Sequence, residues 1–247
     1  MKKTILLLFV LFYSALSFSQ PALLWQKNYG GSMRDEVGNF DNDYDGADHC
    51  IALTNDGYVF VGTSQSNDHD VTGAHGGKDI MVMRCDSSGA ILWSKLIGGT
   101  DTDEGSSIIA TSDGGVAVCG FSASVDGDFT GHIGSFNYDI VIIRMDSLGN
   151  ILWIKNYGGT SEDRSYSFVE TAEGGFMVAG TTSSSDSMVS VHNGLSDIWV
   201  FKTDFSGSLI WEYSYGGSSV DWANSIFLTA DQGAIIGGYT HSDDSII

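Results

Sequence analysis

The feature that most constrains this chain is an internal repeat of about 60 residues. Trp25 and three later tryptophans fall at intervals of 68, 60 and 58 residues, and the last three close the same eight-residue phrase. That phrase reads DSSGAILW, DSLGNILW and DFSGSLIW, and it ends at Trp93, Trp153 and Trp211. A unit that recurs at such a period is one supersecondary element, and its copies must stack to bury a common core.

Other positions keep the same register. A glycine pair begins five positions after each tryptophan, and an aspartate follows four positions after the second glycine. These aspartates are Asp35, Asp103, Asp163 and Asp221. A turn sequence comes next, and it reads NDG at 55–57, DGG at 113–115, EGG at 173–175 and DQG at 231–233. Matches at so many fixed offsets define a true repeat.

Each unit contains four short apolar runs. In the second unit we expect them at Ser107–Thr111, Val116–Phe121, Asp139–Met145 and Asn150–Tyr157. They are rich in Ile, Val and aromatic residues and are separated by Gly and Asp turns, a pattern typical of β-strands. The third run is continuously apolar, which predicts burial on both faces.

These strands predict an all-β fold, a β-propeller of four-stranded antiparallel blades. The expected blades span about 50–97, 106–157 and 165–215, with a partial blade at 223–247 and an N-terminal strand at 22–29. A solenoid of hairpins is the alternative, but its coils are normally shorter than this unit. Because only two strands follow the third blade, we expect the chain to be part of a larger propeller.

The ending Asp-x-x-Gly-x-x-x-Trp resembles the tryptophan-docking motif of quinoprotein-like propellers. That resemblance implies that each Trp stacks on the adjacent blade; it does not imply pyrroloquinoline quinone chemistry, since no adjacent Cys pair is present. The whole unit is similar to repeats of secreted bacterial propeller proteins that often end in a type IX secretion sorting domain. The loop DHDVTGAHGGKD at 68–79 carries this likeness.

The first 19 residues have the order of a secretory signal peptide. Lys2 and Lys3 precede an apolar run at 5–12, and small or polar residues lead to an expected cleavage site near Ser19 and Gln20. Eight apolar residues are too few to span a bilayer, which requires about 20. We therefore expect an exported protein without membrane insertion, its repeats occupying 20–247.

Composition narrows the class of partner. Acidic residues number 31 against 11 basic ones, for a formal net charge of −20. A field this negative argues against nucleic acid or an anionic membrane surface as a partner. The three cysteines, at 50, 85 and 119, occupy different points of the repeat, so we expect small buried side chains and not a disulfide framework.

An insertion unique to the first unit carries the sharpest local motif. It reads DNDYDG at 41–46, with Asp at positions 1, 3 and 5 and Gly at position 6, as in calcium loops. Position 12 is Ala52 instead of Glu, and Asp48 is a possible substitute. The sequence predicts a Ca²⁺ site formed by Asp41, Asp43, Asp45 and Asp48; the alternative is a solvated acidic loop.

Other acidic and histidine positions follow the repeat. Asp79, Asp139 and Asp197 open the third strands, and we expect them to cap loop amides. His75, His132 and His192 recur just before these aspartates, and we expect each to pack within its own loop. A shared metal site would require the three loops to converge, which the spacing of propeller blades opposes.

The function predicted from sequence is a non-catalytic binding or scaffold module with an extracellular protein or glycan ligand. The chain has no GxSxG, HExxH or phosphate-binding glycine loop, and its six Glu residues form no repeated pair. The alternative is a propeller enzyme or carbohydrate-binding protein acting on extracellular polysaccharide. Trp222 is the better candidate for a sugar platform in that case, since Trp199 replaces the core positions of Met81 and Val141.

Overall fold

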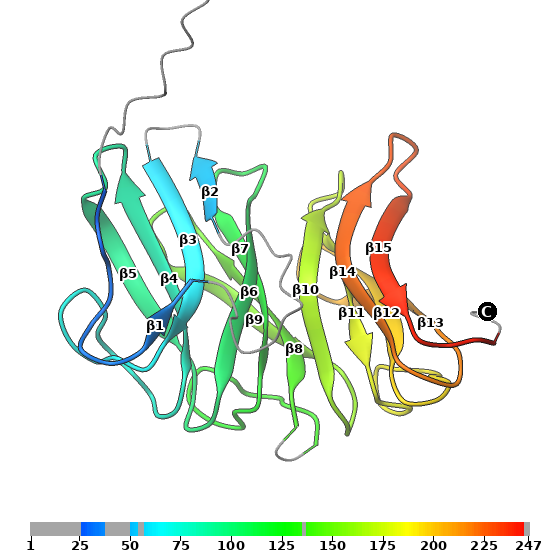
Figure 1. Cartoon of the computed structure of the whole chain (residues 1–247). Helices are drawn as coiled ribbons and strands as arrows, with labels where there is room; N and C mark the ends of the chain where they lie inside the picture. The colour runs from blue at the N-terminus through cyan, green and yellow to red at the C-terminus, as the bar shows by residue number, and fades with distance from the viewer. Residues whose placement is uncertain (1–25, 38–49, 54–56, 135–136, 245–247) are drawn as a thin grey trace, which may run out of the picture.

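The computed structural model describes residues 26–37, 50–53, 57–134 and 137–244, and only the backbone of residues 50, 52 and 53 (Figure 1). Fifteen strands are found in this part of the chain, and all of them lie in antiparallel sheets. None of the described segments is a helix of the length and apolarity that a bilayer crossing requires. The all-β prediction is confirmed.

The strands form four sheets that follow one another in chain order. The first sheet contains β1 (Asp35–Glu36), β2 (Cys50–Leu53), β3 (Gly57–Ser64), β4 (Asp79–Asp86) and β5 (Ile91–Ile97). The second contains β6 (Asp103–Ala110), β7 (Val116–Ser122), β8 (Asp139–Met145) and β9 (Ile151–Tyr157). The third contains β10 (Asp163–Glu170), β11 (Phe176–Thr182), β12 (Asp197–Thr203) and β13 (Leu209–Tyr215). The fourth contains β14 (Asp221–Leu228) and β15 (Ala234–Thr240).

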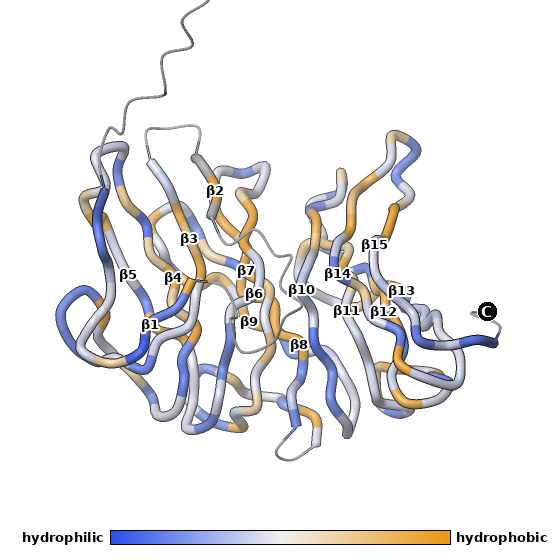
Figure 2. Tube along the Cα trace, in the orientation of Figure 1, coloured by the Kyte–Doolittle hydropathy of each residue, from blue (hydrophilic) through white to orange (hydrophobic). Residues whose placement is uncertain are grey.

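From β2 onward the strands of each sheet pair with their sequence neighbours, and the sheets stand side by side from β1–β5 to β14–β15 (Figure 1). Apolar side chains fill the space between consecutive sheets, which we call a junction. The first junction includes Val61 and Val82 from one sheet and Val141 and Ile143 from the next. Figure 2 shows the apolar stretches along the strands and the hydrophilic ones in the connecting loops.

The third strands are mostly buried. All seven residues of β8 are buried, as the continuous apolar run predicted. Cys85 and Cys119 are buried free thiols, as their positions in the repeat led us to expect. β8 packs against the first sheet on one face and the third sheet on the other, which explains why its sequence does not alternate.

The first strand of a unit starts earlier than predicted. β6 begins at Asp103, four residues before Ser107, and contains a β-bulge between Gly105 and Ser107. The polar and glycine residues at this end do not look like a strand, and the bulge hides the period of two. Bulges recur between Ser165 and Ser167 in β10 and between Ala223 and Ser225 in β14.

The N-terminal side of the first sheet differs from the other sheets in two ways. β1 and β2 both pair with β3, one after the other, where β6 is a single strand against β7. The insertion unique to the first unit therefore interrupts the strand at the place of the bulge. The strand expected at 22–29 is not found in its described part, 26–29, because no neighbouring strand is present there to form a hydrogen-bond ladder.

Candidate functional site

The repeated aspartates gather around the glycine pairs, at the lower end of the sheets in Figure 1. In the first junction, three consecutive amides donate to three carboxylates. Gly98 N lies 3.1 Å from Asp128 Oδ2, and Gly99 N lies 2.8 Å from Asp103 Oδ2. The amide of the next residue donates to Asp126 Oδ1 over 2.8 Å. These amides point outward from a tight turn, so the turn is a backbone nest that attracts negative oxygen atoms.

The same contacts recur at the other glycine pairs. The second glycine of each pair donates to the aspartate four residues later, and the third amide donates to an aspartate of the following loop. The acceptors in order are Asp35, Asp103, Asp163 and Asp221, then Asp68, Asp126, Asp186 and Asp244. A serine hydroxyl accepts the fourth amide each time, from Ser66, Ser124, Ser184 or Ser242. These eight aspartates, which carry much of the negative charge of the repeat, thus accept hydrogen bonds from the backbone of the turns.

The second acidic position in these loops varies. Asp70 and Asp128 accept from the first glycine of the pair, but Met188 stands at the same place in the third sheet. The Met188 amide donates to the Gly158 carbonyl over 3.2 Å, the same backbone contact that the amides of Asp70 and Asp128 make with Gly30 and Gly98. The loss of this carboxylate leaves the turn folded, which indicates that the remaining three acceptors suffice.

A second carboxylate lies beside the first glycine of the pairs at 98–99, 158–159 and 216–217. Asp139 belongs to β8 and Asp163 to β10, and both side chains are fully buried. A Cβ atom on Gly158 would stand 2.5 Å from Asp163 Oδ2 and 2.7 Å from Asp139 Oδ1, so both carboxylates pack against this glycine. The pairs Asp79 with Asp103 and Asp197 with Asp221 are arranged in the same way around Gly98 and Gly216.

In each third-strand aspartate only one of the two carboxylate oxygens accepts a hydrogen bond. Oδ2 of Asp139 accepts the Ile133 amide at 2.7 Å, and Oδ2 of Asp197 accepts the Asn193 amide at 2.7 Å. Oδ1 of each is buried without a hydrogen-bond partner. The prediction that these residues cap loop amides is confirmed, but their pairing with a carboxylate of the next sheet was missed. The signal was present, because the aspartates recur at the start of two successive strands.

Burial and pairing change the acidity of these groups. Desolvation, with a contribution from Asp163, raises the pKa of Asp139 to about 7. Desolvation raises the pKa of Asp103 to about 6 against the hydrogen bonds that it accepts, and Asp79 adds to the rise. The pKa values of Asp79 and Asp163 are raised as well, chiefly by desolvation. Burial therefore favours proton binding at these junctions, and at Asp139 the pKa reaches neutral pH.

His132 and His192 remain within their own loops, as predicted, whereas His75 Nε2 also lies 3.7 Å from Asp128 Oδ2 in the loop of the second sheet. His75 Nδ1 lies 3.4 Å from Asp79 Oδ1, and His132 Nδ1 lies 3.4 Å from Asp139 Oδ2. His192 contacts the Ser185 hydroxyl of the same loop. Burial lowers the pKa of His132 below its usual range, so this ring is neutral at pH 7. Among the described residues no three His, Cys, Asp or Glu side chains are arranged to hold a metal ion.

The predicted calcium ligands Asp41, Asp43, Asp45 and Asp48 lie outside the described residues, and that prediction stays open. The flanking strands place the insertion between β1 and β2 on one edge of β3. Nothing in the described part of the chain replaces these residues as a candidate for calcium.

The repeated tryptophans meet the next sheet at its Asp-x-x-Gly turn. A Cβ atom on Gly149 would stand 2.9 Å from the Trp93 ring, and one on Gly207 would stand 3.0 Å from the Trp153 ring. Both glycines have a positive φ, 81° and 77°, so the turn requires glycine for its backbone as well as for space. Tyr157 Oη also donates to the Gly207 carbonyl, over 2.6 Å.

The two aromatic residues considered for sugar binding have structural contacts. Trp199 is fully buried and its Nε1 donates to Glu212 Oε2 at 2.8 Å, so it belongs to the core as expected. Trp222 is half-buried; its Nε1 donates to Ser196 Oγ at 3.1 Å, and its ring centroid lies 5.4 Å from that of Tyr239. Its indole is thus fixed in orientation between two strands.

Comparison with known proteins gives one relative and no matching family model. The chain is 26% identical over 220 residues to the regulatory protein FlaEY of Caulobacter vibrioides. The match covers 83% of this chain but only 22% of that relative. The similarity therefore concerns nearly the whole repeat region described above and a small part of the longer protein.

Proposed function

We propose that this chain is an exported, non-catalytic β-propeller that serves as a binding or scaffold module outside the cell. Its sheets are the blades, and the Asp-x-x-Gly-x-x-x-Trp phrase is a tryptophan-docking motif. The contact of the Gly149 turn with Trp93, repeated between Gly207 and Trp153, supports this assignment. The ligand is an extracellular protein or a glycan, and neither nucleic acid nor a membrane is a partner.

One observation carries the proposal of a module rather than an enzyme. The polar residues of the repeat make the same hydrogen bonds at successive glycine pairs, with Asp103, Asp163 and Asp221 in equivalent positions. An active site requires groups that differ from their repeat equivalents and converge on one substrate. Here the repeated carboxylates are used by the backbone, which supports a structural role for them.

Incubation with a panel of bacterial and plant polysaccharides tests this proposal directly. We expect retention of the protein on a subset of immobilised glycans, or on none, without release of reducing ends from any soluble glycan. Release of reducing ends that scales with protein concentration would establish a polysaccharide-degrading enzyme and refute the proposal. Trp222→Ala provides a control, because loss of retention in this variant would locate a sugar platform at β14.

We also propose that calcium stabilises the module through the insertion at 41–48. A ligand bound only by the folded state raises its stability by RT ln(1 + [L]/Kd), about 2.7 kcal/mol at a hundredfold excess over Kd. The melting temperature is expected to rise by several degrees with calcium and to return with EDTA, and Asp43→Ala should abolish the rise. Asp243→Ala, an exposed acid outside the insertion, is the matched control. An equal response in both variants would leave the insertion as a solvated loop.

Export is tested separately. N-terminal sequencing of protein recovered from the culture medium is expected to begin near Gln20. Recovery inside the cell with residues 1–19 intact would contradict export and would remove the extracellular ligand from the proposal.

A further inference from the structure

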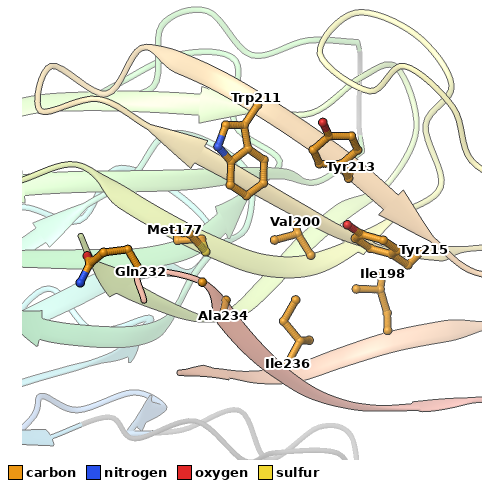
Figure 3. A pocket seen from close by; sticks show the side chains of 10 residues that line it. Met177, Ile198, Val200, Trp211, Tyr213, Tyr215, Gln232, Ala234 and Ile236 are labelled. Atoms are coloured by element: carbon orange, nitrogen blue, oxygen red, sulfur yellow. The ribbon is translucent and has the colours of Figure 1, made fainter. Parts of the chain in front are cut away.

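We infer that His132, Asp139 and Asn156 form a buried site for one zinc ion or a similar divalent transition metal. The site lies on the face of the second sheet that packs against the first sheet. The ion would be held by an imidazole nitrogen, a carboxylate oxygen and an amide oxygen, with water as the fourth ligand. This site does not depend on the glycan or protein ligand proposed above. It shares no residue with the apolar cavity between the third sheet and the β14–β15 hairpin, which Figure 3 shows.

All three side chains are buried, and they carry polar atoms that no described residue satisfies. The side chain of His132 is 1% exposed, Asp139 is fully buried and Asn156 is 8% exposed. In the described part of the chain, no hydrogen-bond partner is found for either ring nitrogen of His132, for the oxygen or nitrogen of the Asn156 amide, or for Oδ1 of Asp139. A buried polar atom without a partner costs free energy, so a group of five indicates a bound ion or water.

The strand register brings Asn156 and Asp139 to the same face of the second sheet. Asn156 of β9 pairs with Val141 of β8, and Asp139 lies two residues before Val141. Because alternate residues of a strand share a face, all three lie on one face, and Val141 packs in the core shared with the first sheet. Asp139 and Asn156 are therefore diagonal neighbours. Residues in this relation are about 7–8 Å apart, a span that two side chains and one ion can bridge.

His132 approaches the same carboxylate from the loop before β8. Its Nδ1 lies 3.4 Å from Asp139 Oδ2, which exceeds the normal hydrogen-bond range of about 2.7–3.2 Å. Two ligands of a tetrahedral zinc ion, each about 2.0–2.2 Å from the metal, are themselves about 3.4 Å apart. The separation of these two atoms therefore fits joint coordination better than a direct hydrogen bond.

The protonation of both groups suits a metal ion. Desolvation lowers the pKa of His132, against the Asn137 carbonyl and Asp101, and a neutral imidazole is the form that binds metals. Desolvation, with a contribution from Asp163, raises the pKa of Asp139 to about 7. A cation beside this carboxylate would favour its ionised form and so offset the effect of burial.

The first sheet has an alanine where the second sheet has His132. The amide after Ala74 donates to Asp79 Oδ2 at 2.9 Å, as the amide after His132 donates to Asp139 Oδ2 at 2.7 Å. Ala74 and His132 therefore occupy equivalent places in their loops, and the shared hydrogen bond shows that the loop does not require a histidine there.

The first sheet also has an apolar residue in place of Asn156. Leu96 is the second-last residue of β5, as Asn156 is of β9, and it pairs with Met81 as Asn156 pairs with Val141. Leu96 and Ala74 pack in the same apolar cluster. The second sheet thus exchanges two residues of one apolar cluster for two metal-binding types together, which indicates a joint role.

Binding of Zn²⁺ to the whole protein tests the site. After treatment with EDTA and dialysis, the protein is titrated with Zn²⁺ in competition with a chromophoric chelator, and we expect one site that is tighter than any other. X-ray absorption at the zinc edge should show an imidazole nitrogen and oxygen ligands at about 2.0–2.2 Å. Ca²⁺ and Mg²⁺ should not displace the zinc, because imidazole favours transition metals.

A double variant that copies the first sheet is the sharpest comparison. His132→Ala with Asn156→Leu restores the apolar pair, so it should fold and bind Zn²⁺ at least about tenfold more weakly. His192→Ala, which removes the loop histidine of the third sheet, should change the affinity less than about twofold. Equal zinc affinity in the wild type and the double variant would overturn the inference and leave buried water as the partner of these atoms. If the double variant does not fold, a zinc-edge spectrum of the wild type without imidazole nitrogen would overturn it equally.

Discussion

β11 and β15 occupy the same place in successive sheets and have similar apolar sequences, FMVAGTT and AIIGGYT. All seven residues of β11 are buried, whereas every residue of β15 keeps partial or full exposure. β11 has a strand on each side, and β15 has β14 alone. The difference teaches that the burial of a second strand in this repeat is provided by the third strand of its own sheet and by the adjacent sheet, and not by its own residues.

The pKa values of equivalent aspartates also differ between the complete sheets and the two-stranded sheet. Desolvation raises the pKa of Asp163, which lies between two complete sheets. At the equivalent Asp221, burial acts in the same direction, but hydrogen bonds from Thr240, Gly217 and Ser242 outweigh it and lower the pKa. An identical residue with identical backbone partners thus changes its acidity with the amount of protein packed around it.

The largest expected effect concerns the tyrosine that closes the fourth strand. Tyr157→Ala removes a ring that is 1% exposed, stacks 4.8 Å from Phe201 and donates to Gly207. We expect a loss of about 3–5 kcal/mol in the free energy of unfolding, as for other buried aromatic truncations. Tyr215→Ala is the matched variant and should cost less than about 1 kcal/mol, because Tyr215 is exposed. Urea denaturation measures both, and equal losses would contradict the comparison.

The next effect is a pH dependence of opposite sign at two equivalent aspartates. The pKa of Asp103, raised by desolvation to about 6, lies above its unfolded value, so the folded state holds a proton that the unfolded state has lost. Its contribution to stability is therefore lost as pH rises from about 4 to 6. Asp103→Asn should remove this loss, roughly 3 kcal/mol, and become more stable relative to wild type as pH rises.

Asp221→Asn is the control for that experiment. The pKa of Asp221 is lowered, so its ionised form stabilises the fold above the unfolded pKa, and this contribution is lost as pH falls. The variant should lose stability relative to wild type as pH rises, in contrast to Asp103→Asn. Because the Asp221 contribution changes below about pH 4 and that of Asp103 between about 4 and 6, thermal melts at several pH values between about 2 and 8 decide this, and parallel profiles for the two variants would refute the assigned shifts.

The smallest expected effect is a difference in the loss of stability when equivalent core side chains of the second strands are truncated. Val178 is fully buried between sheets, and its equivalent Ile236 is only partly buried. We expect Val178→Ala to cost about 2 kcal/mol and Ile236→Ala about 1 kcal/mol, although the isoleucine loses more carbon atoms. Urea denaturation measures both costs, and a cost at Ile236 that exceeds the cost at Val178 would contradict the comparison.

Much of the fold could be predicted because the same sequence pattern recurs in four units. The strand runs at Val116–Phe121 and Asp139–Met145 agree with β7 and β8 to within one residue. The start of β6 could not be predicted, since Gly105 and the bulge beside it break the alternation on which strand prediction depends. The strand predicted at 22–29 is not found in its described part, 26–29, which forms no hydrogen-bond ladder with another described strand.

Of the candidate site, the sequence by itself determined which residues repeat and which elements carry them. It placed Asp79 at the start of a third strand, Asp103 four residues after a glycine pair, and Trp93 and Trp153 within fourth strands, because these features depend on local spacing and turn chemistry. Only the tertiary structure decided that Asp79 faces Asp103 across Gly98, that Trp93 rests on the turn at Gly149, and that Trp211 has no such turn among the described residues. These facts depend on which sheet is packed beside which. The burial of a side chain, the pKa of a carboxylate and the exposure of a strand edge arise from contacts between distant segments. Units with similar sequences therefore differ in these properties.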